Sequence, residues 1–168
     1  MAFAIRATQK VLKRLGASGH AEPGPPTTAL GDWYVNLIHP GRAQLVLCTS
    51  ERSLLCVVLR AQRLKSDLLL QLREGLSEVL SGLDVPAARI ADEMDHMSEP
   101  VIARTASRSV LGSMKDFAYI LGYRLRMHPE ASLTALSLEL CRIPCRPLKG
   151  RYDTAFPQDV ARRLLGAA

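Results

Sequence analysis

Polar side chains alternate with obligatory core positions in the run TASRSVLGSMKDF, residues 105–117. A helix advances about 100° per residue, so Val110, Met114 and Phe117 fall into one apolar stripe. Small and polar residues collect on the opposite side, and they are Ser109, Gly112, Ser113 and Asp116. A neighbouring basic edge consists of Arg108, Lys115 and Arg126. Core packing does not require them there, so this helix face is the best candidate for a functional site.

The start of this helix has the features of an anion site. Thr105 or Ser107 can cap it, which leaves free backbone N–H groups and the positive end of the helix dipole in the first turn. Arg108 would add a bidentate guanidinium and Ser109 a hydroxyl, while Gly112 would let a ligand approach closely. A phosphate or carboxylate would fit. We expect a pocket here, lined from the amino terminus and from the hairpin described below.

A purely structural role is the alternative for the same residues. Ser109 and Ser113 can bond back to the helix backbone. Gly112 can mark a close helix crossing, and Arg108 can pair with an acid such as Glu99. The clustering of small and polar residues away from the apolar stripe favours the site over this alternative.

Asp116 and Arg108 are also the candidates for catalysis. Asp116 could act as a general base, with Arg108 or Arg6 stabilising a phosphorane-like charge, in a small nuclease- or toxin-like hydrolase. A complete catalytic set is not apparent, since the four histidines have no triad partner at an informative spacing. The chain also contains no P-loop, H-E-x-x-H or G-x-S-x-G motif. Whether the protein is an enzyme therefore stays open.

The same helix face could instead bind another protein or a second copy of the chain. Gly112 would let two helices cross closely, and Tyr119 and Tyr123 would anchor the rim of the interface. A protein–protein interaction or homo-oligomer is thus a third hypothesis.

The charge pattern suits an acidic or nucleic-acid partner. The net charge is +6, and residues 1–65, 66–100 and 101–168 carry nine, two and eleven Lys/Arg against three, eight and five Asp/Glu. The fold could neutralise these blocks or leave a basic face opposite an acidic one. In a nucleic-acid complex, the basic N-terminal helix 9–15 and the side chains of Arg108, Arg124 and Arg126 would contact phosphates. Trp33 or Tyr34 would stack on a base. Solvated faces of mixed helices are the alternative.

Apolar runs and cysteines bear on location and on metal binding. The longest apolar run, Leu54–Leu59, is far shorter than the ~18 residues of a membrane span, so no membrane partner is expected. The first residues lack a secretory signal pattern, which favours the cytoplasm. Cys48, Cys56, Cys141 and Cys145 suit a reducing compartment and lack the tight C-x-x-C spacing of a zinc site. No metal and no cofactor is expected.

The elements around the run predict an α+β domain. Trp33–Ile38 alternates, a turn follows at 39–42, and 43–49 returns as the partner strand of a hairpin. Ser53–Leu59 is continuously apolar and predicts a third strand with both faces covered. Further helices are expected over 9–15, 66–83, 86–95, 132–141 and 157–165, and short strands over 3–7 and 100–104. We expect one domain, 1–168, with a small antiparallel sheet of about three to five strands packed with helices, and a Pro/Gly-rich loop at 17–31.

The chain resembles a bacterial domain family of unknown function over roughly residues 4–165. Its start IRATQKVLKRL, its hairpin strand DWYVNL and its run RSVLGSM, followed by a polar residue and Asp, match the pattern of that family. The family more often has asparagine where this chain has Lys115. The resemblance implies no activity, but it singles out as site residues Arg6, Thr8, Lys10, Trp33, Asn36, Arg52, Thr105, Arg108, Ser109, Ser113 and Asp116.

The residues that the resemblance adds each have a structural alternative. Arg6 and Arg52 can pair with nearby acids. Thr8 can serve only as a helix cap, Asn36 can satisfy an edge backbone group, and Trp33 can belong to the core. Binding of an anion or nucleic acid through the helix start and a basic face is favoured over catalysis, because an anion-ready helix start is present and a complete catalytic set is not.

Overall fold

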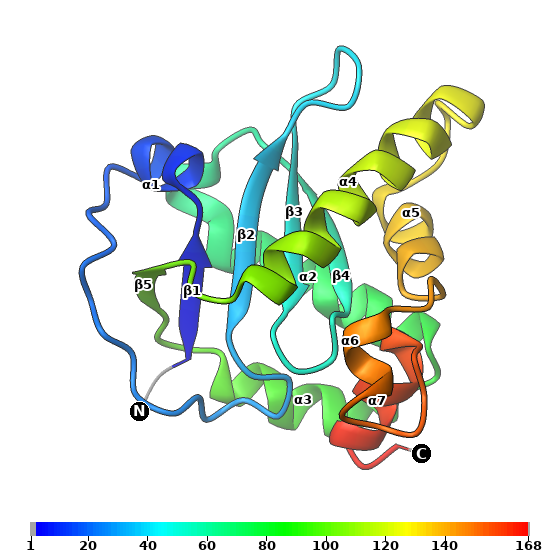
Figure 1. Ribbon diagram of the computed structural model, residues 1–168. Helices are drawn as coiled ribbons and strands as arrows, with labels where there is room; N and C mark the ends of the chain where they lie inside the picture. Colours follow the sequence, from blue (N-terminus) through cyan, green and yellow to red (C-terminus); the bar gives the residue numbers. More distant parts are fainter. Residues whose placement is uncertain (1–2, 168) are drawn as a thin grey trace.

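A sheet of five strands lies at the centre of the structure. The computed structural model describes residues 3–167, and within them the strands are β1 (Ala4–Ala7), β2 (Trp33–Ile38), β3 (Leu45–Ser50), β4 (Cys56–Arg60) and β5 (Val101–Arg104). Their order across the sheet is β4-β3-β2-β1-β5 (Figure 1). β2, β3 and β4 are antiparallel neighbours, whereas β1 runs parallel to both β2 and β5. The sheet is therefore mixed.

The fold class predicted from the sequence, α+β with three to five strands, is confirmed. The expected antiparallel pairing holds for β2, β3 and β4, because hairpin signals are local. β1 reaches its neighbour β2 through a helix and a long loop, and such a connection returns the chain in the same direction. The pairing of β1 with β5 joins segments far apart in the sequence, which no local pattern reveals.

Helices cover both faces of the sheet (Figure 1). The helices are α1 (Gln9–Leu15), α2 (Leu64–Gly82), α3 (Ala87–His96), α4 (Arg108–Met127), α5 (Leu133–Leu140), α6 (Arg146–Lys149) and α7 (Pro157–Leu164). α1, α2 and α3 pack on the face that carries Trp33 and Val35. α4 and α5 pack on the face that carries Tyr34 and Leu47. Within residues 3–167, no helix has both the length and the apolarity needed to cross a membrane.

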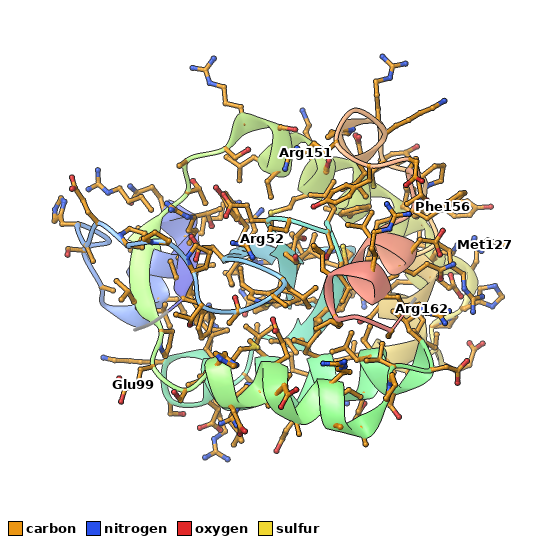
Figure 2. All side chains as sticks on the ribbon, turned by 90° about the horizontal axis from the view of Figure 1, so that it is seen from below. Arg52, Glu99, Met127, Arg151, Phe156 and Arg162 are labelled. Carbon is orange, nitrogen blue, oxygen red and sulfur yellow. The ribbon has the colours of Figure 1, made fainter. Side chains whose placement is uncertain are left out.

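The Pro/Gly-rich segment 17–31 forms an extended loop that skirts β5, and its last residues are held firmly. The Glu93 carboxylate on α3 accepts hydrogen bonds from the amides of Ala29 (2.8 Å) and Leu30 (3.0 Å). The Arg52 guanidinium donates to the carbonyls of Thr28 (3.1 Å) and Ala29 (3.2 Å). Figure 2 shows Arg52 near the centre of the view from below, beside this loop. These bonds fix the approach of the chain to β2.

The apolar stripe predicted for residues 110–125 holds α4 on the sheet. Val110, Met114, Phe117 and Leu121 are each at most 2% exposed. Burial of such a side chain contributes about 1.5–3 kcal/mol, so the rotation of α4 about its own axis is well determined. The opposite side of the helix, which includes Arg108 and the other polar residues of the run, is left free of the core.

Candidate functional site

A cleft of about 380 Å³ lies between the first half of α4 and the segment that leads into α6. Its lining residues are Arg108, Ser109, Gly112, Ser113, Asp116 and Phe117 from α4, and Ile143, Pro144, Cys145, Arg146 and Pro147 from the facing segment. The polar residues of the run 105–117 therefore do share one concave surface. The expected second wall is different, because the amino terminus and the hairpin do not line this cleft.

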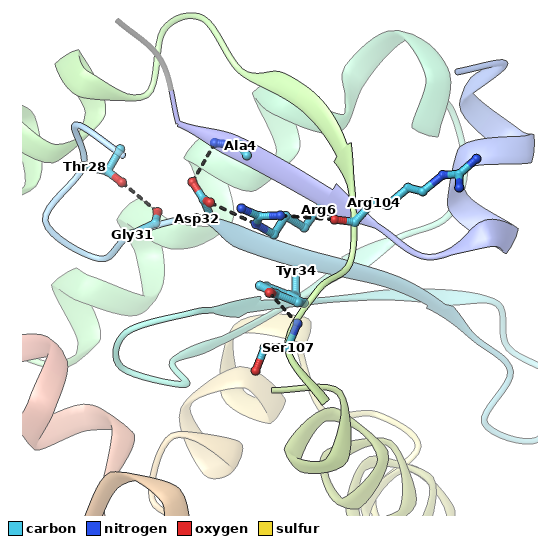
Figure 3. Close-up of polar contacts among 8 residues, drawn as sticks. All are labelled: Ala4, Arg6, Thr28, Gly31, Asp32, Tyr34, Arg104 and Ser107. Atoms are coloured by element: carbon cyan, nitrogen blue, oxygen red, sulfur yellow. Dashed lines mark hydrogen bonds and ion pairs between the residues drawn. The ribbon is translucent and has the colours of Figure 1, made fainter. Parts of the chain in front are cut away.

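The first turn of α4 is positioned by a residue of the sheet. Ser107 is the N-cap, and its side chain accepts a hydrogen bond from the amide of Val110 at 3.2 Å. The amide of Ser107 donates to the phenolic oxygen of Tyr34 on β2 at 3.0 Å (Figure 3). Thr105, the other candidate cap, is not used. The amides of Arg108 and Ser109 lack intrahelical acceptors, as in any first turn, and they lie at the cleft.

Two arginines bring positive charge to the cleft from opposite walls. Arg108 and Arg146 both line it and are both exposed. Neither belongs to an ion pair among the described residues. Glu99, the acid that could have neutralised Arg108, lies instead in the turn between α3 and β5, near the lower edge of the view in Figure 2. Asp116 is the one carboxylate among the lining residues 108–117 and 143–147.

Two hydroxyls face the same space. Ser109 is exposed and Ser113 is largely buried, with 8% of its surface exposed, and both line the cleft. Among the described residues, neither hydroxyl bonds back to a helix carbonyl in the way that Ser137 donates to the Leu133 carbonyl at 2.7 Å. Both therefore remain available to a ligand.

The segment 143–147 is a stiff wall. Pro144 and Pro147 each fix one backbone angle. The amide of Cys145 donates to the carbonyl of Ala155 at 2.7 Å, which ties the segment to the chain before α7. The cleft is thus largely preformed.

The Cys145 thiol in this wall is not an activated nucleophile. Burial, and secondarily the negative charge of Asp116, raise the pKa of Cys145 to about 11 from the ordinary 9.0. At neutral pH the thiol is therefore protonated. All four cysteines are buried and free, and within residues 3–167 no group of three or more His, Cys, Asp or Glu side chains is placed to hold a metal ion.

Several site residues implied by the family resemblance lie on the sheet, outside the cleft. Arg6 pairs with the buried Asp32 at 3.0 Å and also donates to the Arg104 carbonyl (Figure 3). Thr8 occupies the N-cap position of α1, but its side chain accepts no hydrogen bond from the helix amides. Its hydroxyl donates to the Asn36 side-chain oxygen at 2.9 Å instead. The hydrogen-bonding groups of these side chains are therefore paired within the protein. For Arg6, this is the structural alternative of pairing with a nearby acid.

The remaining implied residues are dispersed. Lys10 is exposed on α1, and Arg52 braces the loop described above. Trp33 is fully buried on the face that α1–α3 cover, and Tyr34 is fully buried beneath α4. Neither ring has a free face, so the predicted stacking of a base on Trp33 or Tyr34 is wrong for this structure. The alternating pattern of β2 did not show that helices cover both of its faces.

The cleft also contains residues that the sequence did not single out. Arg146 and Cys145 belong to the stretch CRIPCRP, whose two prolines interrupt helix. The position of Arg146 between Pro144 and Pro147 is a local pattern that indicates a stiff segment with a positive charge. That this loop faces α4 depends on contacts between distant segments.

A comparison with protein families identifies the chain at the family level. A family model described as a domain of unknown function, DUF6933, matches residues 4–160. The chain belongs to the DUF6933 family. The resemblance to an uncharacterised family is thereby confirmed, and the DUF6933 match includes both walls of the cleft. No curated protein and no solved structure matches the chain.

Proposed function

We propose that the cleft between α4 and segment 143–147 binds the phosphate groups of an anionic ligand, with nucleic acid as the polymeric case. The observation that carries the proposal is the convergence of unpaired Arg108 and Arg146 on a cleft at the start of α4. Guanidinium groups bind phosphate through two parallel hydrogen bonds, and the free amides of a helix start favour negative charge.

The distribution of charge supports the same proposal. The block 66–100, with two Lys/Arg and eight Asp/Glu, forms α2 and α3 on one side of the sheet. The block 101–168, with eleven Lys/Arg and five Asp/Glu, includes α4 and the segment 143–147 on the other side. A polyanion would therefore be attracted to the side with the cleft and repelled by α2 and α3. On that second side, Lys10, Lys13 and Arg14 of α1 offset part of the acidic charge.

Binding explains the lining residues better than catalysis does. Asp116 and Arg108, the candidate catalytic pair, do line one cleft. No histidine lies among the lining residues 108–117 and 143–147, and the Cys145 thiol stays protonated at neutral pH. Asp116 would instead limit how far an anion moves along the helix, because like charges repel.

The test is a titration of the protein with inorganic phosphate, followed through backbone amide signals by NMR. We expect saturable shifts of the Ser109 and Gly112 amides that weaken as salt is added. Arg108→Gln and Arg146→Gln should each raise the dissociation constant about tenfold, since a hydrogen bond to a charged group contributes about 1.5 kcal/mol or more.

Arg151→Gln is the matched control. Arg151 is exposed, lies two residues after α6 and does not line the cleft. Its substitution changes the net charge by the same amount as Arg108→Gln or Arg146→Gln does. Wild-type affinity in this variant would show that the effect belongs to the cleft. The proposal would be contradicted if phosphate caused no NMR shifts at the Ser109 and Gly112 amides. It would also be contradicted if all three arginine variants lost the same amount of phosphate affinity.

A further inference from the structure

Two tyrosines on α4 are exposed. Tyr119 has 79% and Tyr123 has 50% of its surface exposed, whereas Phe117 on the same helix is 1% exposed. Neither ring takes part in the packing of α4 on the sheet, which depends on residues such as Met114 and Leu121. The rings need another explanation.

These tyrosines form one stripe with basic side chains. At 100° per residue, Arg108, Lys115, Tyr119, Tyr123 and Arg126 fall within about 80° of one another on the helix. All five are exposed. The stripe extends from Arg108 to Arg126, a rise of about 27 Å at 1.5 Å per residue, and it begins at the cleft. We call it the basic-aromatic stripe.

The charge of the stripe is not neutralised. Arg108, Lys115 and Arg126 form no ion pair among the described residues, in contrast to Arg124, which pairs with Glu139 at 3.1 Å. Arg124, one of the predicted phosphate contacts, is therefore not available without breaking that pair. Asp116 is the single acid within α4.

We propose that the basic-aromatic stripe binds single-stranded nucleic acid, with one phosphate in the cleft and successive bases stacked on Tyr119 and Tyr123. The proposal rests on the phosphate binding proposed above and names its ligand class. Sequence-tolerant single-strand binding needs cations that follow the backbone and aromatic faces for the bases. Lys115 and Arg126 flank the two rings and supply those cations.

Other occupants fit the stripe less well. Duplex bases are already stacked on one another, so the two rings would find no free base face. A second copy packed through the same surface would bring Arg108, Lys115 and Arg126 of both copies together, with Asp116 of each copy as the single acid of α4 to oppose them. This excess of positive charge disfavours a two-fold contact. A strand of phosphates complements the charge instead.

The experiment measures the fluorescence anisotropy of labelled single-stranded oligothymidylate, dT12, with the full chain. We expect binding that weakens with a linear dependence of log K on log salt. Tyr119→Ala and Tyr123→Ala should each weaken it about tenfold, because stacking contributes about 1–3 kcal/mol per base. Tyr119→Phe and Tyr123→Phe should keep it near wild type, since the ring face remains.

Leu70→Ala is the matched control. Leu70 is 55% exposed on α2, on the opposite side of the sheet, so the change removes a similarly exposed apolar side chain. The control should bind dT12 as wild type does. Unchanged dT12 binding in both Tyr→Ala variants, or equal binding of a duplex of the same length, would overturn the stripe proposal. A third result would also overturn it. In that case the wild type forms a dimer and does not bind dT12, and Tyr119→Ala and Tyr123→Ala each dissociate the dimer.

Inorganic phosphate separates the two proposals. The Tyr119→Ala and Tyr123→Ala variants should still show the phosphate-induced shifts at Ser109 and Gly112, while Arg108→Gln should lose both phosphate and dT12 affinity. Phosphate binding without dT12 binding would overturn the stripe alone. Absence of both would overturn the cleft proposal as well.

Discussion

At the scale of single residues, Tyr34 has the most informative position. Its ring belongs to the core beneath α4, and its hydroxyl accepts a hydrogen bond from the Ser107 amide, so a buried aromatic residue fixes the start of α4. Aromatic residues with a polar tip often join a core to an otherwise unsatisfied polar group in this way. Other polar side chains near the sheet bond to one another in a similar way. Arg6 pairs with Asp32, and the Thr8 hydroxyl donates to Asn36.

Tyr34→Phe removes only the phenolic acceptor. We expect the free energy of unfolding to fall by about 1 kcal/mol, because the Ser107 amide loses its partner in a largely buried site. Urea denaturation would measure this loss, and amide hydrogen exchange should become faster at Ser107. Tyr123→Phe, which removes an exposed hydroxyl from α4, should change neither quantity. Equal stability of the two variants would contradict the anchoring role of Tyr34.

At the scale of elements, long-range side-chain bonds hold the irregular segments. The loop 17–31 has little apolar surface of its own, but Glu93 accepts hydrogen bonds from its last amides and Arg52 donates to its last carbonyls. Segment 143–147 is held by a backbone hydrogen bond instead, which the Cys145 amide donates to the Ala155 carbonyl. Loops fixed in this way can position a binding site with little cost in entropy on binding.

Glu93→Ala tests the anchoring of the loop. Glu93 is 3% exposed, and its loss leaves the amides of Ala29 and Leu30 without their acceptor. We expect a loss of about 2 kcal/mol in stability and faster proteolytic cleavage within 17–31. Asp95→Ala, at an exposed position on the same helix, should leave both unchanged. Cleavage at the wild-type rate in Glu93→Ala would show that other contacts hold the loop.

At the scale of the whole molecule, helices cover both faces of the sheet, and cysteine thiols are buried in the resulting core. Cys48, Cys56 and Cys141 are fully buried, and burial raises the pKa of each above the ordinary 9.0, to about 12 for Cys141. The unfolded chain ionises these thiols near pH 9, whereas the folded chain keeps them protonated. The unfolded state therefore binds fewer protons above pH 9, and stability must fall as pH rises.

Each of these three thiols should lower stability by about 1.4 kcal/mol between pH 8 and pH 10, in addition to the effect of other groups. Urea unfolding at the two pH values would measure the total. Cys141→Ala lacks one such thiol, so its loss over the same interval should be smaller by about 1.4 kcal/mol. An identical pH dependence in the variant and the wild type would mean that Cys141 ionises in the folded chain.

Local pattern alone determined much of this protein. Helix α1 from Gln9 to its left-handed C-cap Gly16, strand β2, and the two unlike faces of α4 all follow from residues within a few positions of one another. The polar face of α4 and its cap Ser107 were likewise visible, because side-chain periodicity and capping are short-range effects.

Only the tertiary structure decided what that face meets. The parallel pairing of β1, the burial of Trp33 and Tyr34, and the choice of segment 143–147 as the second wall depend on contacts between segments distant in sequence. The same packing leaves Tyr119 and Tyr123 outside the core. A residue type states what a side chain can bind, but the packing of the rest of the chain decides whether a ligand can reach it.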